Sequence, residues 1–474
     1  MSRLYIARIT LEAASPLSVG SGEAGVSDVS LVRDANGLPM IAGASIQGLM
    51  KALAKRDGLP AMGLLGDNDY PGKIQFSDAR IHGSDDVAVS GVILEGVADD
   101  LLQRYLDDEP LKRDHVKLDN RGTSDDHHKF DRAALPRGTR MSFELSMWGD
   151  ADDQDKFTSL LSLLYHPLFR LGGATRRGYG RVKVRAGRWR FWADPLEQSG
   201  PISKLREAAY SVISDDWTEI ASDEPSFDTK YKLSLNSDSW WRAGGDGVRV
   251  RTGKYRNPSA DNRKDDTDAA FTREPSISWD TTSNQKGWID PGDVIAEDYV
   301  LAGSSIRGAL WHRTLYHWNL HNRNFVDLDA KDDADVKRKS KAPPAMLALF
   351  GEAKQGDDGQ RSALIIDDIV FTPAHVTVAD HVSIDRFTGG ARNGALFSEE
   401  LVQIDDAGIE VHIIIDEQLL AQRAQTCLFD EKVILDAFKA AVEDLCNNRL
   451  ALGAKSSGYF TGTCTPPIMT EAAQ

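Results

Sequence analysis

Two arginines and a tyrosine stand among glycines near residue 175, where they could bind a phosphate backbone. The segment Gly172–Gly180 reads GGATRRGYG, so backbone N–H donors accompany the guanidinium groups of Arg176 and Arg177 and the ring of Tyr179. Guanidinium groups form paired hydrogen bonds with phosphates, and aromatic rings stack on bases. The pattern therefore favours contact with RNA. The alternative is a tight turn between a helix and a strand.

A related segment near the C-terminus keeps part of this chemistry. Residues 453–459 read GAKSSGY, with Lys455 as the cation and Tyr459 as the ring. We align this segment with residues 173–179 and expect Lys455 and Tyr459 to contact RNA in the same way.

A second pair of matching segments could bind a phosphate through the start of a helix. Residues 38–51 read LPMIAGASIQGLMK, and residues 299–311 read YVLAGSSIRGALW. Each predicts an apolar strand, a turn of small residues and a first helical turn, whose unpaired N–H groups attract anions. A plain helix cap with glycines for close packing is the alternative. The candidate RNA contacts are Gly43, Ser45, Gln47 and Lys51 in the first segment and Ser305 and Arg307 in the second.

Other landmarks flank both segments in the same order. Each is a short motif in the first half that has a counterpart in the second half: Leu65-Gly66 with Phe350-Gly351, Ser77-Asp78 with Asp367-Asp368, and His115 with His381. Shared turn chemistry could produce any one match, but chance would not preserve the order. The sequence therefore predicts a tandem duplication.

The composition narrows the class of protein. The chain has 474 residues, 41% of them hydrophobic and 27% charged, which is typical of a globular protein with two or three domains. The net charge of −16 argues against a protein that simply coats nucleic acid, although basic residues gather at particular loops. Three cysteines without paired spacing predict no disulfide and no zinc ribbon, and no signal-peptide pattern precedes the first strand. These features favour the cytoplasm.

We expect two α+β domains, each a small sheet with helices on one face. The first should occupy residues 1–195 and the second residues 229–474 with a C-terminal tail, joined by a linker or bridging helix at 196–228. Apolar periodicity predicts a helix over Lys432–Leu445, and strand patterns lie at Met141–Leu145.

Long polar segments at 115–140 and 381–400 read as functional loops by composition. Three histidines, His312, His317 and His321, share a helical stretch but lack the glutamate of a zinc-protease motif, so we interpret them as structural.

The landmarks together resemble the RAMP superfamily of CRISPR-associated proteins, and in particular the backbone subunits of type III effector complexes. The residues that carry the resemblance are Pro16–Gly22, Ser27-Asp28, Pro39–Gly48, His115–Asp131 ahead of Leu135–Thr139, and Gly172–Gly180. The resemblance covers most of the chain twice, so the protein looks like a tandem fusion of two such subunits.

This resemblance implies a fold and a set of partners. The fold would be two tandem RRM-like (ferredoxin-like) RAMP domains with thumb insertions. The partners would be CRISPR RNA, target RNA and other CRISPR effector subunits, namely a large subunit and further RAMP subunits. In the thumbs, the resemblance points to Lys117 and Arg121 in the first and Arg386 in the second as RNA contacts. Phe130 and Phe387 would be apolar tips that wedge between bases, or the thumbs would pack on a neighbouring subunit.

The resemblance also implies metal-dependent cleavage of the bound target RNA. The family's catalytic aspartate corresponds to Asp28, which would hold Mg²⁺ or another divalent metal. In the second copy Glu274 takes the aligned place, in a rewritten segment, as a candidate catalytic residue. Without the family, a solvated loop acid or turn cap would be the simpler interpretation of Asp28.

Three other functions remain open from the sequence. The chain could be a non-catalytic CRISPR RNA-binding scaffold of the same complex. It could be an endoribonuclease that processes precursor RNA with a histidine or lysine. It could also be an adaptor that binds proteins only, which the pI of about 5.2 would suit.

Overall fold

The computed structural model of the chain shows two compact units. It describes residues 3–20, 29–60, 62–66, 71–93, 96–118, 124–193, 217–221, 230–244, 269–279, 283–284, 287–288, 293–324, 342–352, 359–454 and 458–465. The first unit comprises Met1–Thr175, Tyr179–Phe227 and Pro275–Ile295, and the second comprises Arg176–Gly178, Asp228–Glu274 and Ala296–Gln474. Each unit thus takes a short segment from the other half of the sequence. The domain limits at 195 and 229 stay a prediction.

The first unit is built around six elements in the order βαββαβ. They are β1 (Arg3–Ala13), α1 (Gly43–Arg56), β3 (Ile74–Phe76), β7 (Arg140–Gly149), α4 (Gln154–Ser162) and β8 (Val182–Ala193). The four strands lie in the order β8-β1-β7-β3, and each neighbouring pair is antiparallel. This is the ferredoxin-like topology.

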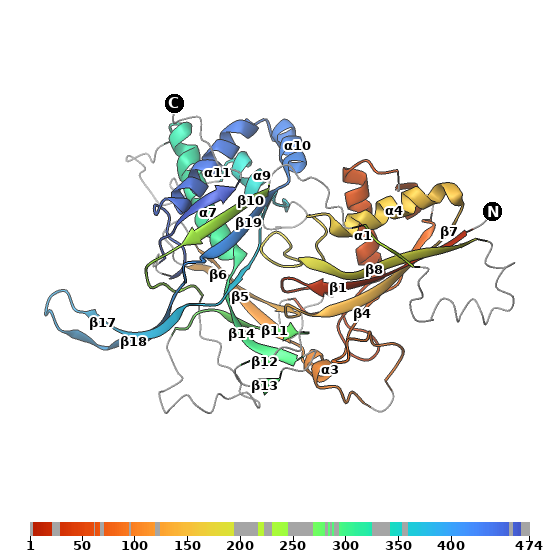
Figure 1. Cartoon of the computed structure of the whole chain (residues 1–474). Helices are drawn as coiled ribbons and strands as arrows, with labels where there is room; N and C mark the ends of the chain where they lie inside the picture. Colours follow the sequence, from red (N-terminus) through yellow and green to blue (C-terminus); the bar gives the residue numbers. More distant parts are fainter. Residues whose placement is uncertain are drawn as a thin grey trace. The chain divides into compact units, whose positions relative to one another are not determined.

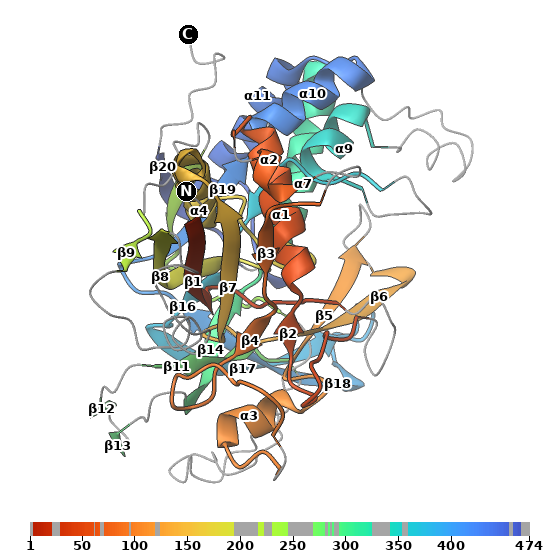
Figure 2. The same ribbon diagram turned by 90° about the vertical axis from the view of Figure 1, so that its right-hand side faces the viewer.

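Shorter elements complete the first unit. In the main sheet β2 (Met40–Ile41) and β4 (Ala79–Ile81) extend the β7 side, and β9 (Thr218–Glu219) pairs with β8. Figure 2 shows α1 alongside β3. The remaining elements are α2 (Met62–Leu65), α3 (Asp100–Tyr105), the 3₁₀ helices η1 (Ala151–Asp153) and η2 (Leu163–Tyr165), and the strand pair β12 (Ser283–Asn284) and β13 (Gly287–Trp288).

The second unit repeats the same plan. Its elements are β10 (Lys230–Asn236), α7 (Gly303–His321), β15 (Leu364–Ile366), β19 (Ile409–Ile415), α11 (Glu431–Cys446) and β20 (Thr461–Thr465). The sheet order β20-β10-β19-β15 matches that of the first unit strand for strand. In Figure 1 the helices α7 and α11, with α9 (Pro344–Phe350) and α10 (Glu417–Cys427), gather on one face of this sheet. Two further strands are β14 (Asp293–Leu301) and β16 (Ile369–Phe371), which pair through Tyr299–Leu301, and β11 (Arg273–Ser278) contributes Glu274 to this unit.

The apolar pattern of α11 shows why the helices cover the sheet. Ile434, Phe438, Ala441 and Leu445 recur every three or four residues, and all four are buried. This spacing places them along one face of a helix, which packs into the core together with strand residues such as Val411. The helix predicted over Lys432–Leu445 and the strand predicted over Met141–Leu145 are therefore confirmed.

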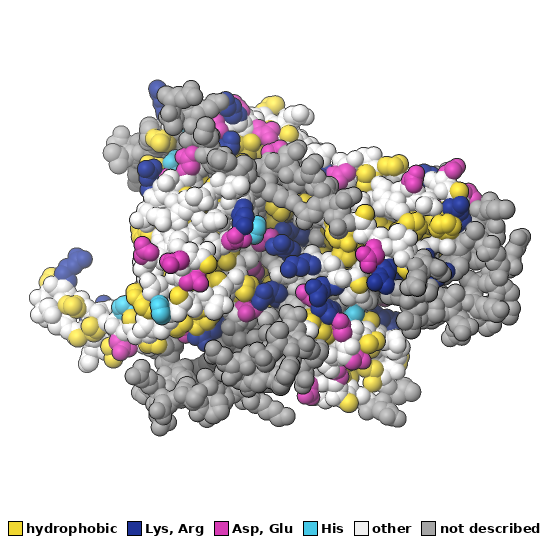
Figure 3. Space-filling view, viewed as in Figure 1, with side chains coloured by type: hydrophobic (Ala, Val, Ile, Leu, Met, Phe, Trp, Pro, Cys, Tyr) yellow, Lys and Arg dark blue, Asp and Glu magenta, His cyan; other side chains and the backbone are white. Residues whose placement is uncertain are grey.

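Two β-hairpins stand where the composition had predicted polar loops. β5 (Leu111–Leu118) pairs with β6 (Ser124–Ala134), and β17 (His375–Ile384) pairs with β18 (Ala391–Gln403). The loop interpretation from composition was wrong, because cross-strand hydrogen bonds pair these segments as strands. In Figure 3 apolar side chains line the hairpin β17–β18 at the left, with basic side chains near its tip.

The two repeated sheets with their helices confirm the α+β class and the tandem ferredoxin-like domains. Among the helices that the structure describes, none is long and apolar enough to span a membrane.

A buried carboxylate joins α7 to α11 in the second unit. Asp444 is 4% exposed and accepts hydrogen bonds of 2.6 Å from Arg313 Nε and His317 Nε2. Burial alone would raise the pKa of Asp444, but the hydrogen bonds from Arg313 and His317 outweigh it and hold the pKa below its ordinary value. The structural role predicted for His317 fits this contact.

We expect Asp444→Asn to lower the free energy of unfolding at pH 7 by about 2 kcal/mol, because two charge-assisted hydrogen bonds weaken. The folded pKa lies below the unfolded value, so the ionised carboxylate stabilises the fold above that unfolded value and the stabilisation is lost as the pH falls through the folded pKa. Urea unfolding from pH 7 to pH 3 should therefore show the two proteins converging. Asp436→Asn, which removes a surface pair on α11, should change little; an equal loss in both variants would contradict the prediction.

Candidate functional site

The helix within each matching segment begins at a carboxylate from the short link between two strands, β3 and β4 for α1 and β15 and β16 for α7. The backbone N–H of Gly43 donates to Asp78 Oδ1 at 2.8 Å, and the N–H of Gly303 donates to Asp368 Oδ1 at 2.8 Å. In both cases the residue before the helix is an alanine in extended conformation without a side-chain cap. A carboxylate from outside the helix therefore binds the first unpaired N–H group, where the helix dipole favours a negative charge.

The glycine at each helix start is required by close packing. A Cβ atom on Gly43 would lie 2.5 Å from the carbonyl oxygen of Phe76, and one on Gly303 would lie 2.4 Å from that of Ile366. The simpler alternative from the sequence, a cap with glycines for close packing, thus describes this part of both segments. A phosphate at either helix start would have to share the N–H groups with an anionic side chain of the protein itself.

The side chains on the first turns are placed differently. Ser45 and Ser305 are exposed, as a contact with RNA requires. Gln47 donates to the carbonyl oxygen of Leu65 at 3.3 Å, and Lys51 is half-buried farther along α1.

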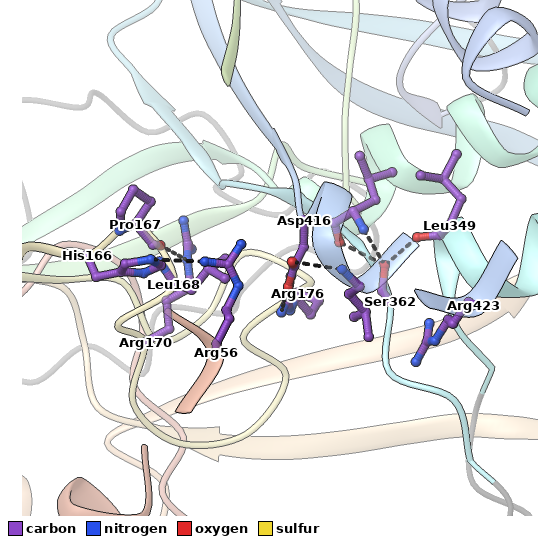
Figure 4. Close-up of polar contacts among 12 residues, drawn as sticks. Arg56, His166, Pro167, Leu168, Arg170, Arg176, Leu349, Ser362, Asp416 and Arg423 are labelled. Carbon is purple, nitrogen blue, oxygen red and sulfur yellow. Dashed lines mark hydrogen bonds and ion pairs between the residues drawn. The ribbon is translucent and has the colours of Figure 1, made fainter. Parts of the chain in front are cut away.

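An arginine cluster (Arg176, Arg177 and Arg307) forms at the start of α7 in the second unit. Arg307 Nη1 donates to the carbonyl oxygen of Arg176 at 3.2 Å and to Ser362 Oγ at 3.1 Å. Figure 4 shows Arg176 facing Asp416, and the two form a buried ion pair at 3.3 Å. Burial, together with the positive charges of Arg177 and Arg176, lowers the pKa of Arg307 to about 9.

Arg307 is thus a buried cation that is poorly solvated and is also repelled by the charges of Arg177 and Arg176. A bound phosphate would offset that repulsion, because it brings negative charge to the guanidinium groups. Arg177 is half-buried, so part of its side chain reaches the surface. The structure thus brings together three of the predicted RNA contacts and adds two residues that sequence analysis missed, Asp416 and Ser362.

Gly178 directly follows Arg177 in the sequence and packs against Asp368, the carboxylate that caps α7. Its φ of +99° is strained for any residue with a side chain, and a Cβ atom there would lie 1.9 Å from Asp368 Oδ1. The tripeptide Arg176–Gly178 is therefore packed without a gap against Asp368.

Tyr179 lies in the core, so the predicted stacking on a base is wrong for this conformation. Its ring is fully buried, its hydroxyl lies 2.9 Å from His115 Nε2, and Arg113 lies over the ring at 4.7 Å. A base could reach the ring only after these contacts to β5 were broken.

Backbone hydrogen bonds also correct our alignment of the two glycine-rich loops. Leu171 N–H donates to Gly180 O, and Leu452 N–H donates to Gly458 O, so these two glycines are equivalent. The loop of the second repeat is three residues shorter. Tyr179 therefore comes before the second glycine, whereas Tyr459, which is 47% exposed, comes after it. Lys455 lies outside the described residues.

The two hairpins share a stacked cross-strand pair. His115 lies opposite Phe130 with ring centroids 5.0 Å apart, and His381 lies opposite Phe397 at 5.1 Å. In each hairpin the register shifts directly after the next pair, which marks a bulge at the same place. Phe130 is thus part of a strand and is no apolar tip.

The predicted contacts on the hairpins divide between described and undescribed residues. Arg386 and Phe387 occupy the turn of β17–β18, and Phe387 is 95% exposed. Lys117 lies in β5, but its side chain is outside the described part of the structure, as is the whole of Arg121.

Of the two candidate catalytic acids, the structure describes one. Asp28 lies outside the described residues. Glu274 lies in β11 and is 7% exposed, which places it within a strand and not in an open loop. Within the described ranges no three His, Cys, Asp or Glu side chains come together as a metal site. The metal therefore stays a prediction that depends on Asp28.

The chain is similar to one known family and to a solved structure of low identity. The sequence pattern of one family, the RAMP superfamily, matches residues 10–183 and 292–460. Among solved structures, a chain described as "Cryo-EM structure of the Type III-B Cmr-beta bound to cognate target RNA" is similar, with 14% identity and a TM-score of 0.29. The match covers 40% of this chain and 61% of that chain, so it spans less than two thirds of the neighbour. No curated protein matches the sequence.

We expect Gly178→Ala to lower the free energy of unfolding by about 2 kcal/mol, because the new methyl group meets Asp368 in a strained backbone conformation. Gly308→Ala is the matched control, since a Cβ there meets nothing within 4 Å and alanine favours the helix. Chemical unfolding should show a loss for the first variant and no loss for the second. Equal stability of Gly178→Ala and wild type would refute the packing argument.

Proposed function

Since the chain belongs to the RAMP superfamily, we propose that it is a CRISPR RNA-binding backbone subunit of a type III-like effector complex that cleaves guide-bound target RNA. Its partners would be the CRISPR RNA, the target RNA, a large subunit and further RAMP subunits. The observation that carries this proposal is that the family pattern matches both repeats, each of which has the ferredoxin-like core and a projecting hairpin.

The duplication suits an extended RNA ligand. Two domains of the same fold on one chain could each contact a single-stranded RNA, which would raise the overall affinity. Such binding depends on backbone contacts more than on bases, which matches a guide of variable sequence.

The arginine cluster supports RNA binding in the second unit. Arg307 and Arg176 are held by Asp416, Ser362 and backbone carbonyls, so their positions are fixed before a ligand arrives. Preorganised cations bind phosphate with less loss of conformational entropy than mobile surface side chains. Arg177, which is partly exposed, is the member best placed to meet a phosphate directly.

Cleavage is proposed for the first repeat through Asp28. RNA can be cut by its own 2′-hydroxyl when the phosphate is held in line and proton transfer is assisted. A divalent metal held by Asp28 would neutralise the charge that develops on the phosphate. The protein's own contribution would be to hold the RNA backbone, and in the sequence Asp28 follows glycines at 20, 22 and 25.

The second repeat is a weaker candidate for cleavage. Glu274 is 7% exposed in β11, and a carboxylate buried in a strand cannot approach an RNA phosphate without a local rearrangement. We therefore propose that this repeat binds RNA and that Asp28 carries the chemistry.

We expect Asp28→Ala in the assembled complex to abolish one cut in the target RNA, by roughly a hundredfold or more in rate, while RNA binding is retained. Single-turnover cleavage with Mg²⁺ measures the rate, and a filter-binding titration measures the affinity. If every cut persists, the chain is a non-catalytic scaffold. If precursor RNA is cut without metal, the chain is a processing nuclease.

Glu274→Gln should cut target RNA at the wild-type rate in the same assay, because the buried side chain does not contact the substrate. Loss of a second cut in this variant, with Asp28-dependent cleavage intact, would assign catalysis to Glu274 instead.

Arg177→Gln should weaken RNA binding several-fold and reduce the slope of log affinity against log salt by about one, the signature of one lost phosphate contact. Arg188→Gln is the control, because Arg188 is an arginine on β8 with a loose ion pair to Glu219. An unchanged slope for Arg177→Gln would remove this residue from the RNA site, and failure of the wild type to bind any RNA would favour a protein adaptor.

A further inference from the structure

The starts of α1 and α7 are equivalent, but among the residues that the structure describes only the start of α7 is covered by a segment from the other repeat. In the second unit the tripeptide Arg176–Gly178, which comes from the glycine-rich loop of the first repeat, lies on this surface. Three contacts hold it there: Arg307 donates to the carbonyl oxygen of Arg176, Asp416 pairs with the Arg176 guanidinium, and Gly178 lies against Asp368.

The start of α1 has the same framework. Gly43 donates to Asp78 as Gly303 donates to Asp368, at the same distance of 2.8 Å. Each of these helix-start glycines touches the carbonyl oxygen of the neighbouring strand. The surface that receives Gly178 on α7 is thus built a second time on α1.

The two surfaces differ in how far they are covered. Ser77 and Asp78 are exposed, whereas their counterparts Asp367 and Asp368 are buried and half-buried. Ala44 on the first turn of α1 is also exposed, whereas its counterpart on α7, a serine at position 304, is half-buried. Without the tripeptide Arg176–Gly178, we expect the start of α7 to be as exposed as the start of α1.

Gln47 on α1 occupies the position of Arg307 on α7, and both side chains carry an N–H group that can donate to a carbonyl oxygen. Arg307 binds the docked tripeptide through a carbonyl oxygen, and the amide of Gln47 can donate to a carbonyl oxygen as well. Its present bond to Leu65 O is long, at 3.3 Å, so exchange for a better-placed acceptor would cost little.

We propose that the start of α1, with Asp78 and Gln47, is the docking site for the glycine-rich loop of a RAMP-superfamily domain on another chain. This deepens the proposed function and rests on it, because that function supplies a further RAMP subunit. The incoming loop would place a glycine against Asp78 and a carbonyl oxygen at Gln47, as Arg176–Gly178 does on α7. Such a contact uses different surfaces on the two partners and therefore extends a row of subunits.

The partner is a different chain and not a second copy of this one. In a second copy the loop that carries Arg176–Gly178 already lies against its own α7, and its counterpart between Gly453 and Gly458 is three residues shorter. The occupant we commit to is thus a RAMP subunit with a loop of the longer kind.

A site-specific photo-crosslink tests the contact. The full chain, with a benzophenone amino acid at Ala44, would be expressed in its native host and purified as the complex, irradiated, and its crosslinked peptides identified by mass spectrometry. The same amino acid at Ala52 is the control, since this alanine is also exposed on α1, about 12 Å along the helix. We expect a glycine-rich loop of another RAMP-superfamily chain to be crosslinked at Ala44 and at least tenfold less at Ala52.

A blocking variant provides the second measurement. Ala44→Trp should reduce the amount of that RAMP chain in the purified complex at least fivefold, while Ala52→Trp retains it and both variants unfold at the wild-type temperature. A crosslink from Ala44 to any other segment, the absence of a crosslink, or full retention of the RAMP chain in Ala44→Trp would overturn the proposal. The RNA content of each preparation tests the proposed function separately from the docking site. A complex that lacks RNA contradicts the proposed function, whichever peptide is crosslinked.

Discussion

A carboxylate bound to the first backbone N–H of a helix organises both halves of this protein. Asp78 binds Gly43, and Asp368 binds Gly303, at equal distances. The contact ties the central helix of each domain to the strand that follows it, and it satisfies a donor that would otherwise stay unpaired at a crowded position. The fold depends on it because a glycine must stand where strand carbonyl oxygens approach within 2.5 Å of a would-be Cβ atom.

The same carboxylate determines what the helix start can do. A negative side chain already occupies the place where a phosphate would bind, so the anion site that the sequence suggested is filled from within. On α7 the carboxylate instead supports protein packing through Gly178, and the neighbouring Arg307 reaches a backbone carbonyl. Arg176 is held by Asp416, and Arg307 is held by Ser362 and backbone carbonyl oxygens, whereas Arg177 is partly exposed.

The prediction of the fold from sequence succeeded where a pattern was local or repeated. The resemblance to the RAMP superfamily is confirmed over both repeats, and the ferredoxin-like order of strands appears twice. Composition predicted polar loops around His115 and His381, whereas the family resemblance implied thumb insertions there, and both segments pair as hairpins. Composition failed there because a hairpin of this kind is stabilised by cross-strand pairs, such as His381 with Phe397, that lie far apart in the sequence.

The sequence by itself determined the duplication, the family and the helical face of α11, since each depends on the order or spacing of neighbouring residues. Only the tertiary structure determined the surroundings of Tyr179, Glu274 and Gly178. The first is buried under β5, the second lies within a strand, and the third is packed on a carboxylate 190 residues away. Burial and long-range hydrogen bonds join residues whose separation carries no periodic signal, so only the folded chain shows which glycine packs against a distant carboxylate and which carboxylate caps a helix.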